Sequence, residues 1–241
     1  MSRARIYGNQ SQLDLAIADY TRVIDLDPNN IDAYFWRGSI YSNQNRLDLA
    51  IADYTKIIDL DPTHVMAYIT RSFIYNSQGQ PDLAIADYTA AIDVNPTDYA
   101  YWGRAQLYRE QGQLDLAIAD YTQAIALYPM YESAYFERGL LYREQRQHDL
   151  AIANFSKVIE LNSTDAYAYN ARGFSYYDQG QYEQSLADQN KAIELNPTFA
   201  DAYYGRGLVY REQGQTELAC ADLATVIELD PNFDPSYYGR G

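Results

Sequence analysis

The side chains that most often carry out chemistry are scarce in this sequence. It has one cysteine, Cys220, and two histidines, His64 and His148. Zinc sites need three or four Cys, His or acidic ligands at regular spacing, and these residues offer no such set. The sequence also contains no Gly-rich phosphate loop, no dinucleotide-binding glycine motif and no nucleophile elbow. We therefore expect no catalytic residues, no metal and no cofactor, and a protein that is not an enzyme.

Arginine and aspartate recur instead, at a fixed spacing of 16 residues. Each arginine is expected between two packed helices, where a lone charge is costly and a paired guanidinium is well suited. We therefore expect ion pairs between helices, within one repeat or across adjacent repeats. The alternative is a ladder of arginines that binds anions. The pairs are Arg37 with Asp53, Arg71 with Asp87, Arg104 with Asp120, Arg172 with Asp188, and Arg206 with Asp222, whereas Arg138 faces the neutral Asn154.

These spacings belong to a repeat that runs through the chain. The segment that begins at Leu13 and reads LDLAIADYT returns at Leu47 and at Leu114, and prolines recur in steps of 33 or 34 residues. Each repeat has two apolar stripes at helical spacing, which predicts a hairpin of two helices. We expect one domain, 1–241. Its repeats are 31–64, 65–97, 98–131, 132–165, 166–199 and 200–233, with a partial repeat at 1–30 and a partial helix at 234–241.

The residue types within each repeat are specific. An aromatic residue, a small residue, Tyr, Ala, a second aromatic residue and Pro follow at fixed positions, as in Tyr34, Gly38, Tyr41, Ala50, Tyr54 and Pro62. This pattern resembles the tetratricopeptide repeat over essentially the whole chain. The resemblance implies an all-α fold, a right-handed superhelical solenoid of stacked helix-turn-helix hairpins. It also implies that most of the 26 tyrosines belong to the repeat core.

The resemblance further implies a concave groove, lined by the first helix of each hairpin, that holds extended or helical peptides. The alternative is that these side chains pack against the first helix of the next repeat. The expected groove residues are Phe35, Trp36, Met66, Ile69, Phe73, Tyr99, Trp102, Gln106, Arg109, Phe136, Leu140, Arg143, Tyr167, Asn170, Phe174, Tyr177, Tyr204, Leu208 and Arg211. Acidic residues outnumber basic ones on this face, so we expect a ligand with apolar anchors and Lys or Arg.

The repeat 166–199 departs most from the pattern. Ser185 and Gln189 stand at positions that are otherwise small or aromatic, and Asn170 interrupts the aromatic residues expected in the groove. We expect weaker packing there, and the alternative is a joint that flexes or is specific to one partner.

Composition restricts the partners. The 241 residues carry a net charge of −15, which repels nucleic acid, and no run of 18 apolar residues could span a membrane. We expect a cytoplasmic, non-enzymatic interaction module that binds a protein or peptide segment. One alternative is a scaffold that assembles head to tail through incomplete terminal helices, and another is an accessory domain of a larger enzyme or signalling protein.

Overall fold

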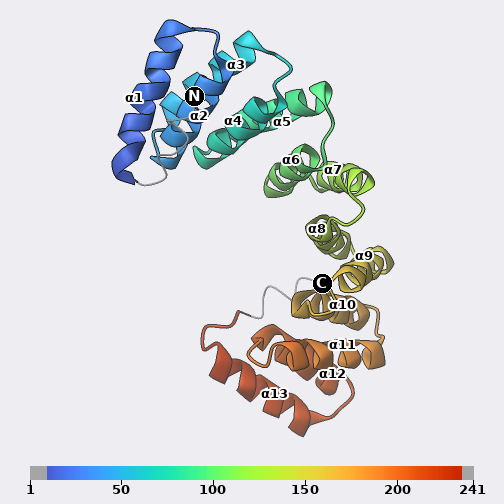
Figure 1. The fold of residues 1–241 in the computed structure, drawn as a ribbon. Coiled ribbons are helices and arrows are strands. Elements are labelled where there is room, and N and C mark those ends of the chain that lie inside the picture. Colours follow the sequence, from blue (N-terminus) through green and yellow to red (C-terminus); the bar gives the residue numbers. More distant parts are fainter. Residues whose placement is uncertain (1–9, 235–241) are drawn as a thin grey trace. The chain divides into compact units, whose positions relative to one another are not determined.

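The computed structural model describes residues 10–234, and within that range the chain forms α-helices joined by short turns. It divides into two compact units, residues 1–127 and 128–241, which we describe one at a time (Figure 1). The first unit contains α1 (Gln10–Leu26), α2 (Ile31–Asn43), α3 (Leu47–Leu60), α4 (Val65–Ser77), α5 (Pro81–Val94), α6 (Asp98–Glu110) and α7 (Leu114–Leu127). The second contains α8 (Glu132–Glu144), α9 (His148–Leu161), α10 (Ala166–Asp178), α11 (Tyr182–Leu195), α12 (Ala200–Glu212) and α13 (Thr216–Leu229).

Within each unit the helices pack as stacked hairpins. In the first unit α2 packs on α3, α4 on α5 and α6 on α7. Successive hairpins also contact one another, because α3 packs on α4 and α5 packs on α6. The second unit repeats this arrangement with α8 and α9, α10 and α11, and α12 and α13. The all-α fold of stacked helical hairpins expected from the sequence is confirmed. We call the two members of a hairpin its first and second helix.

Local chemistry explains where the helices end. The first helices end in a turn whose left-handed residue is usually glycine, such as Gly79 with φ +70°, because glycine has no Cβ to clash there. Asn45 and Arg146 adopt the same conformation with φ 59°. The second helices end where the residue before proline becomes extended, as at Asp61 with φ −139° and ψ 91°.

The core consists of small residues that admit large rings. Ala50 and Ala67 are completely buried, and the Tyr54 ring is buried in the same cluster. At Tyr88 this kind of packing requires Gly103, because a Cβ there would lie 2.4 Å from Cζ of Tyr88. Tyr54, Tyr88 and Phe155 each pack in this way against a glycine of a neighbouring first helix.

The two ends fall largely outside this description. The partial helix expected at 234–241 lies outside the described residues except for Asp234, and so do the first nine residues of the partial repeat at 1–30.

Candidate functional site

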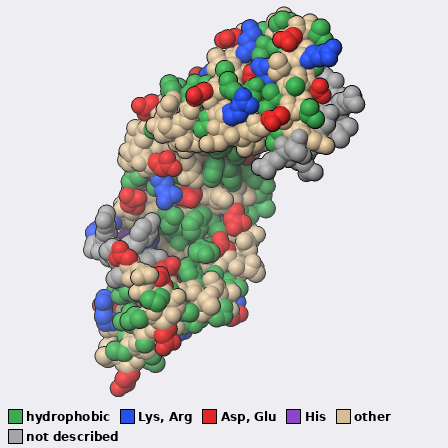
Figure 2. Space-filling model, turned by 90° about the vertical axis from the view of Figure 1, so that its left-hand side faces the viewer, with side chains coloured by type: hydrophobic (Ala, Val, Ile, Leu, Met, Phe, Trp, Pro, Cys, Tyr) green, Lys and Arg blue, Asp and Glu red, His purple; other side chains and the backbone are tan. Residues whose placement is uncertain are grey.

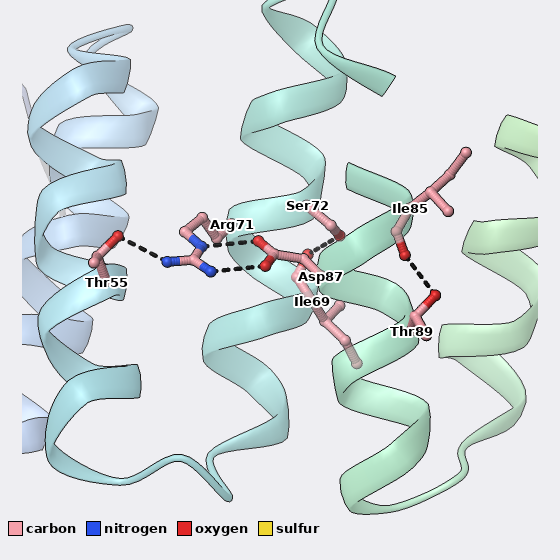
Figure 3. Close-up of polar contacts among 7 residues, drawn as sticks. All are labelled: Thr55, Ile69, Arg71, Ser72, Ile85, Asp87 and Thr89. Atoms are coloured by element: carbon pink, nitrogen blue, oxygen red, sulfur yellow. Dashed lines mark hydrogen bonds and ion pairs between the residues drawn. The ribbon is translucent and has the colours of Figure 1, made fainter. Parts of the chain in front are cut away.

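The arginines of the repeat join three helices. Arg71, on α4, donates from Nε and Nη2 to the two carboxylate oxygens of Asp87 on α5, at 2.8 and 2.7 Å, and from Nη1 to Thr55 Oγ1 on the preceding α3, at 2.8 Å (Figure 3). Such a bidentate pair is strong because both hydrogen bonds are charge-assisted. The same geometry occurs for Arg37 with Asp53 and Thr21, Arg104 with Asp120 and Thr89, Arg172 with Asp188 and Ser156, and Arg206 with Asp222 and Asn190.

Two tyrosines of the same first helix flank each of these guanidinium groups. The Arg71 guanidinium carbon lies 6.0 Å from the ring centroid of Tyr68 and 5.6 Å from that of Tyr75. Hydrogen bonding to Asp87 raises the pKa of Arg71 above its ordinary value. Because Nε, Nη1 and Nη2 of Arg71 all donate within the protein, this geometry supports a structural role and leaves little capacity for the alternative of anion binding.

Arg138, on α8, has a different environment. Its Nε donates to Asn154 Oδ1 at 3.0 Å, and Asn154 Nδ2 donates to the Leu150 carbonyl at 2.7 Å. Burial lowers the pKa of Arg138, whereas the aspartate partners raise the pKa of the arginines in the other repeats. This is the one described pairing of this type in which the acceptor is neutral.

A second set of contacts between repeats was missed by the sequence reasoning. The amide of Gln78, at the end of α4, donates to Asp48 Oδ1 at the start of α3, at 3.0 Å. Aspartate recurs at the equivalent place in other repeats, as Asp14, Asp82 and Asp149. The signal was present, because a glutamine follows each of these acids at a nearly constant interval. The other described pairs are Gln44 with Asp14, Gln111 with Asp82, and Gln179 with Asp149.

The first helices of the first unit carry large apolar side chains, most of them aromatic, that are exposed or half-buried. Trp36, Met66, Phe73 and Tyr99 are 36, 52, 42 and 42% exposed, and Trp102 is half-buried. The Tyr99 ring links two of them, with its centroid 5.9 Å from that of Phe73 and 6.2 Å from that of Trp102. We call these five residues the aromatic patch. Phe35, Gln106 and Arg109 are half-buried on the same helices.

In the second unit most of the expected groove residues make contacts within the protein. Arg143 donates to Asp178 at 2.9 Å and lies over the Phe174 ring, at 5.1 Å from its centroid. The Tyr177 hydroxyl donates to Glu212 at 3.3 Å. Three further rings contact other aromatic rings: Phe136 contacts Phe155, exposed Tyr167 contacts Phe199, and Tyr204 contacts Phe233. Arg211 forms an ion pair with Glu212, and Leu140 is half-buried.

Four residues expected to line the groove are buried, and for them that expectation is wrong. Ile69 is 3% exposed within a core cluster, and Phe174 is 1% exposed beneath Arg143. Asn170 and Leu208 are also buried. The equivalent residues in other repeats are mostly half-buried, and Phe73 is exposed.

The repeat 166–199 has a polar core. Gln189 is completely buried at the place where Tyr54 and Phe155 stand in other repeats, and its amide fits between Gly173 and Gly205. Its Nε2 donates to the Asn170 carbonyl at 3.4 Å, while Gln189 Oε1 and Asn170 Oδ1 have no partner. Unpaired buried carbonyl oxygens weaken packing.

The histidines and the cysteine take no part in a reactive cluster. His64 Nδ1 accepts a hydrogen bond from the Ala67 N–H and caps α4, His148 lies 3.8 Å from Asp178, and Cys220 is exposed on α13. Among residues 10–234 no group of three or more His, Cys, Asp or Glu side chains is arranged to hold a metal ion. No helix in the described part of the chain is both long and apolar enough to cross a membrane.

Sequence comparison identifies the family. Tetratricopeptide repeat models match residues 4–45, 31–64, 67–98, 105–145, 139–180, 175–214 and 200–233, which together cover most of the chain. The chain belongs to the tetratricopeptide repeat family. Tetratricopeptide repeat proteins generally mediate protein–protein interactions, and their helical scaffold is typically non-enzymatic. A comparison with curated proteins gave no match.

Solved tetratricopeptide repeat structures share the fold. The C-terminal part of a repeat protein from Cytophaga hutchinsonii superposes with a TM-score of 0.79, at 20% identity over 99% of this chain and 98% of that one. YrrB, described as having an unusual peptide-binding site, gives 0.66 at 23% identity over 74% and 93%. MamA gives 0.65 at 26% identity over 70% and 93%.

Proposed function

We propose that this chain is a non-enzymatic interaction module whose aromatic patch binds a segment of a partner protein. The observation that supports this most directly is the exposure of large apolar side chains on three consecutive first helices, α2, α4 and α6. Large aromatic side chains are enriched among the residues that dominate binding energy at protein interfaces. An exposed apolar cluster of this kind typically marks an interaction site.

The patch is held in place before any partner binds. Tyr99 contacts rings on both sides, and Phe73 also packs edge-to-face on the buried Tyr88, with ring centroids 6.0 Å apart. Rings that are already ordered lose little conformational freedom on binding, which favours affinity. On the face drawn in Figure 2, hydrophobic side chains gather in patches with acidic side chains among them.

Charge indicates the chemistry of the partner. Apart from Arg37, Arg71 and Arg104, the charged residues of α2, α4 and α6 are the acids Asp32, Asp98 and Glu110 and the base Arg109. We therefore propose that the bound segment combines apolar anchors with Lys or Arg. Binding should weaken as salt is added, because part of the attraction is between exposed charges.

Capture of partners on the immobilised chain tests this proposal. The variant Phe73→Ala with Tyr99→Ala removes two exposed rings of the patch, and Met130→Ala is the control, because Met130 is 59% exposed and lies outside the patch. Proteins that the control retains and the patch variant loses are identified by mass spectrometry. Their binding segments are then synthesised and titrated against both variants.

We expect the patch variant to bind such a segment at least about tenfold more weakly than the control does. Circular dichroism of the variants checks that both keep the helical fold. Equal affinity of the two variants for every captured segment would contradict the proposal.

A further inference from the structure

The second helices of the first unit expose a leucine at the equivalent place in each repeat. Leu15, Leu49, Leu83 and Leu116 are 57, 41, 48 and 48% exposed, on α1, α3, α5 and α7. We call these four residues the leucine row. The row lies on the opposite helix of each hairpin from the aromatic patch, so the two surfaces involve different side chains.

The fold itself does not require leucine at these places. The residue that follows each leucine, such as Ala50 after Leu49, is completely buried and makes the helix contact. The repeat 166–199 has Gln184 at the equivalent place and still forms its second helix, α11. Glutamine has almost the same helix propensity as leucine, so helix formation does not explain the row.

Acidic side chains accompany the leucines. The residue before each is an exposed aspartate: Asp14, Asp48, Asp82 and Asp115. In three of these cases a neutral glutamine amide from the next hairpin donates to the carboxylate, which orients the carboxylate without adding a positive charge. These three steps of the row therefore present an apolar side chain beside a positioned carboxylate.

The surface beside Leu49 is also hollowed. A depression of about 310 Å³ is lined by Leu47, Asp48 and Leu49 of α3, by Asn45 and Arg46 of the turn before α3, and by Gln78 at the end of α4. Its two leucines offer apolar contact to a partner's side chain beside the carboxylate of Asp48, and Arg46 adds a positive charge to the same lining.

We propose that the leucine row is a second docking surface, for a partner segment that places Lys or Arg beside apolar side chains. Charge complementarity supports this occupant, because the row pairs each leucine with an aspartate. A second copy of this chain fits poorly, since each copy has a net charge of −15 and would bring acids against acids. The inference is independent of the aromatic patch.

A synthetic basic helix is the probe. A fluorescent peptide of Leu, Ala and Lys, with leucines on one face and lysines beside them, is titrated by anisotropy against the full chain. The row variant is Leu49→Ser with Leu83→Ser, and the control is Met130→Ala, because Met130 is exposed and lies outside both the leucine row and the aromatic patch. The patch variant Phe73→Ala with Tyr99→Ala is measured beside them. All three variants alter exposed side chains, and circular dichroism verifies that they are folded.

We expect the row variant to bind the peptide at least tenfold more weakly and the control Met130→Ala to bind it within twofold of the unaltered chain. We also expect methyl signals of Leu49 and Leu83 to shift when the peptide is added. Undiminished binding by the row variant would overturn the inference. So would loss of binding in the patch variant alone, a result that would leave the proposed function standing. Equal binding of a matched peptide with Glu in place of Lys would also overturn it.

Discussion

Tyr54 has a hydroxyl group that the fold buries without a hydrogen-bond partner. Its ring is completely buried in the first unit, and the equivalent residue in the repeat 132–165 is Phe155, which is buried equally well. Leaving a buried polar group unpaired costs about 1–3 kcal/mol. The unpaired hydroxyl therefore destabilises the folded protein, and Phe155 shows that the ring can be buried equally well without it.

Tyr54→Phe should raise the free energy of unfolding by about 1 kcal/mol, because it removes the unpaired hydroxyl and keeps the ring. Urea unfolding followed by circular dichroism measures the change. Tyr88→Phe is the matched control and should lower stability, since the Tyr88 hydroxyl is hydrogen-bonded to Ser72. If both substitutions destabilise the protein to the same extent, the hydroxyl of Tyr54 has a partner in solution.

The buried tyrosines also predict how the protein responds to alkali. Burial raises the pKa of Tyr54 and of Tyr88 to about 12, whereas a tyrosine in the unfolded chain has a pKa of about 10. The folded state favours the neutral tyrosines. Their contribution to the free energy of unfolding is therefore fully present below a pH of about 10 and is lost as the pH rises towards 12. Phenolate absorbance during a pH titration should show a late fraction that ionises together with loss of helix. Ionisation of every tyrosine near pH 10 in a folded protein would contradict this.

At the scale of the helices, the link between first and second helix is weakest where its acceptor is neutral. Arg138 donates a hydrogen bond to the neutral amide oxygen of Asn154. At the equivalent place in the next repeat, Arg172 makes two charge-assisted hydrogen bonds to Asp188. Burial lowers the pKa of Arg138, whereas hydrogen bonding to Asp188 raises the pKa of Arg172.

Asn154→Asp should therefore stabilise the protein by about 1 kcal/mol, the gain of a charged pair less the lost hydrogen bond to the Leu150 carbonyl. The reverse change in the next repeat, Asp188→Asn, should destabilise it by about 2 kcal/mol. Thermal unfolding and urea unfolding measure both. A stabilising Asp188→Asn would show that the pairs contribute nothing to stability.

The sequence predicted the links between helices better than it predicted exposure. Arg71 and Asp87 could be paired from their 16-residue spacing, because an arginine and an aspartate recur together at that spacing in most repeats. The equally regular Gln78 and Asp48 were not paired, because polar residues near a turn are usually solvated. Buried Phe174 could not be separated from exposed Phe73 by its position in the repeat, since burial depends on how far a side chain reaches and on what its neighbours leave open.

At the scale of the whole chain, charge governs how copies meet. A net charge of −15 makes like copies repel at low ionic strength. We therefore expect static light scattering to give one molar mass, that of a monomer, across a wide range of protein concentration in low salt. A mass that rises with concentration would favour the alternative of head-to-tail assembly. The terminal residues that such assembly would use, 1–9 and 235–241, lie outside the described part of the chain.

In the first unit the bonds between successive hairpins use the same atoms at each joint, and this has an evolutionary consequence. If residues 65–97 were excised from the gene, Arg104 would face Thr55, and Gln111 would face Asp48, as Arg71 and Gln78 do now. Duplication or loss of one such segment would thus recreate a joint that already works. Natural selection can adjust the length of this protein in whole hairpins without inventing new contacts.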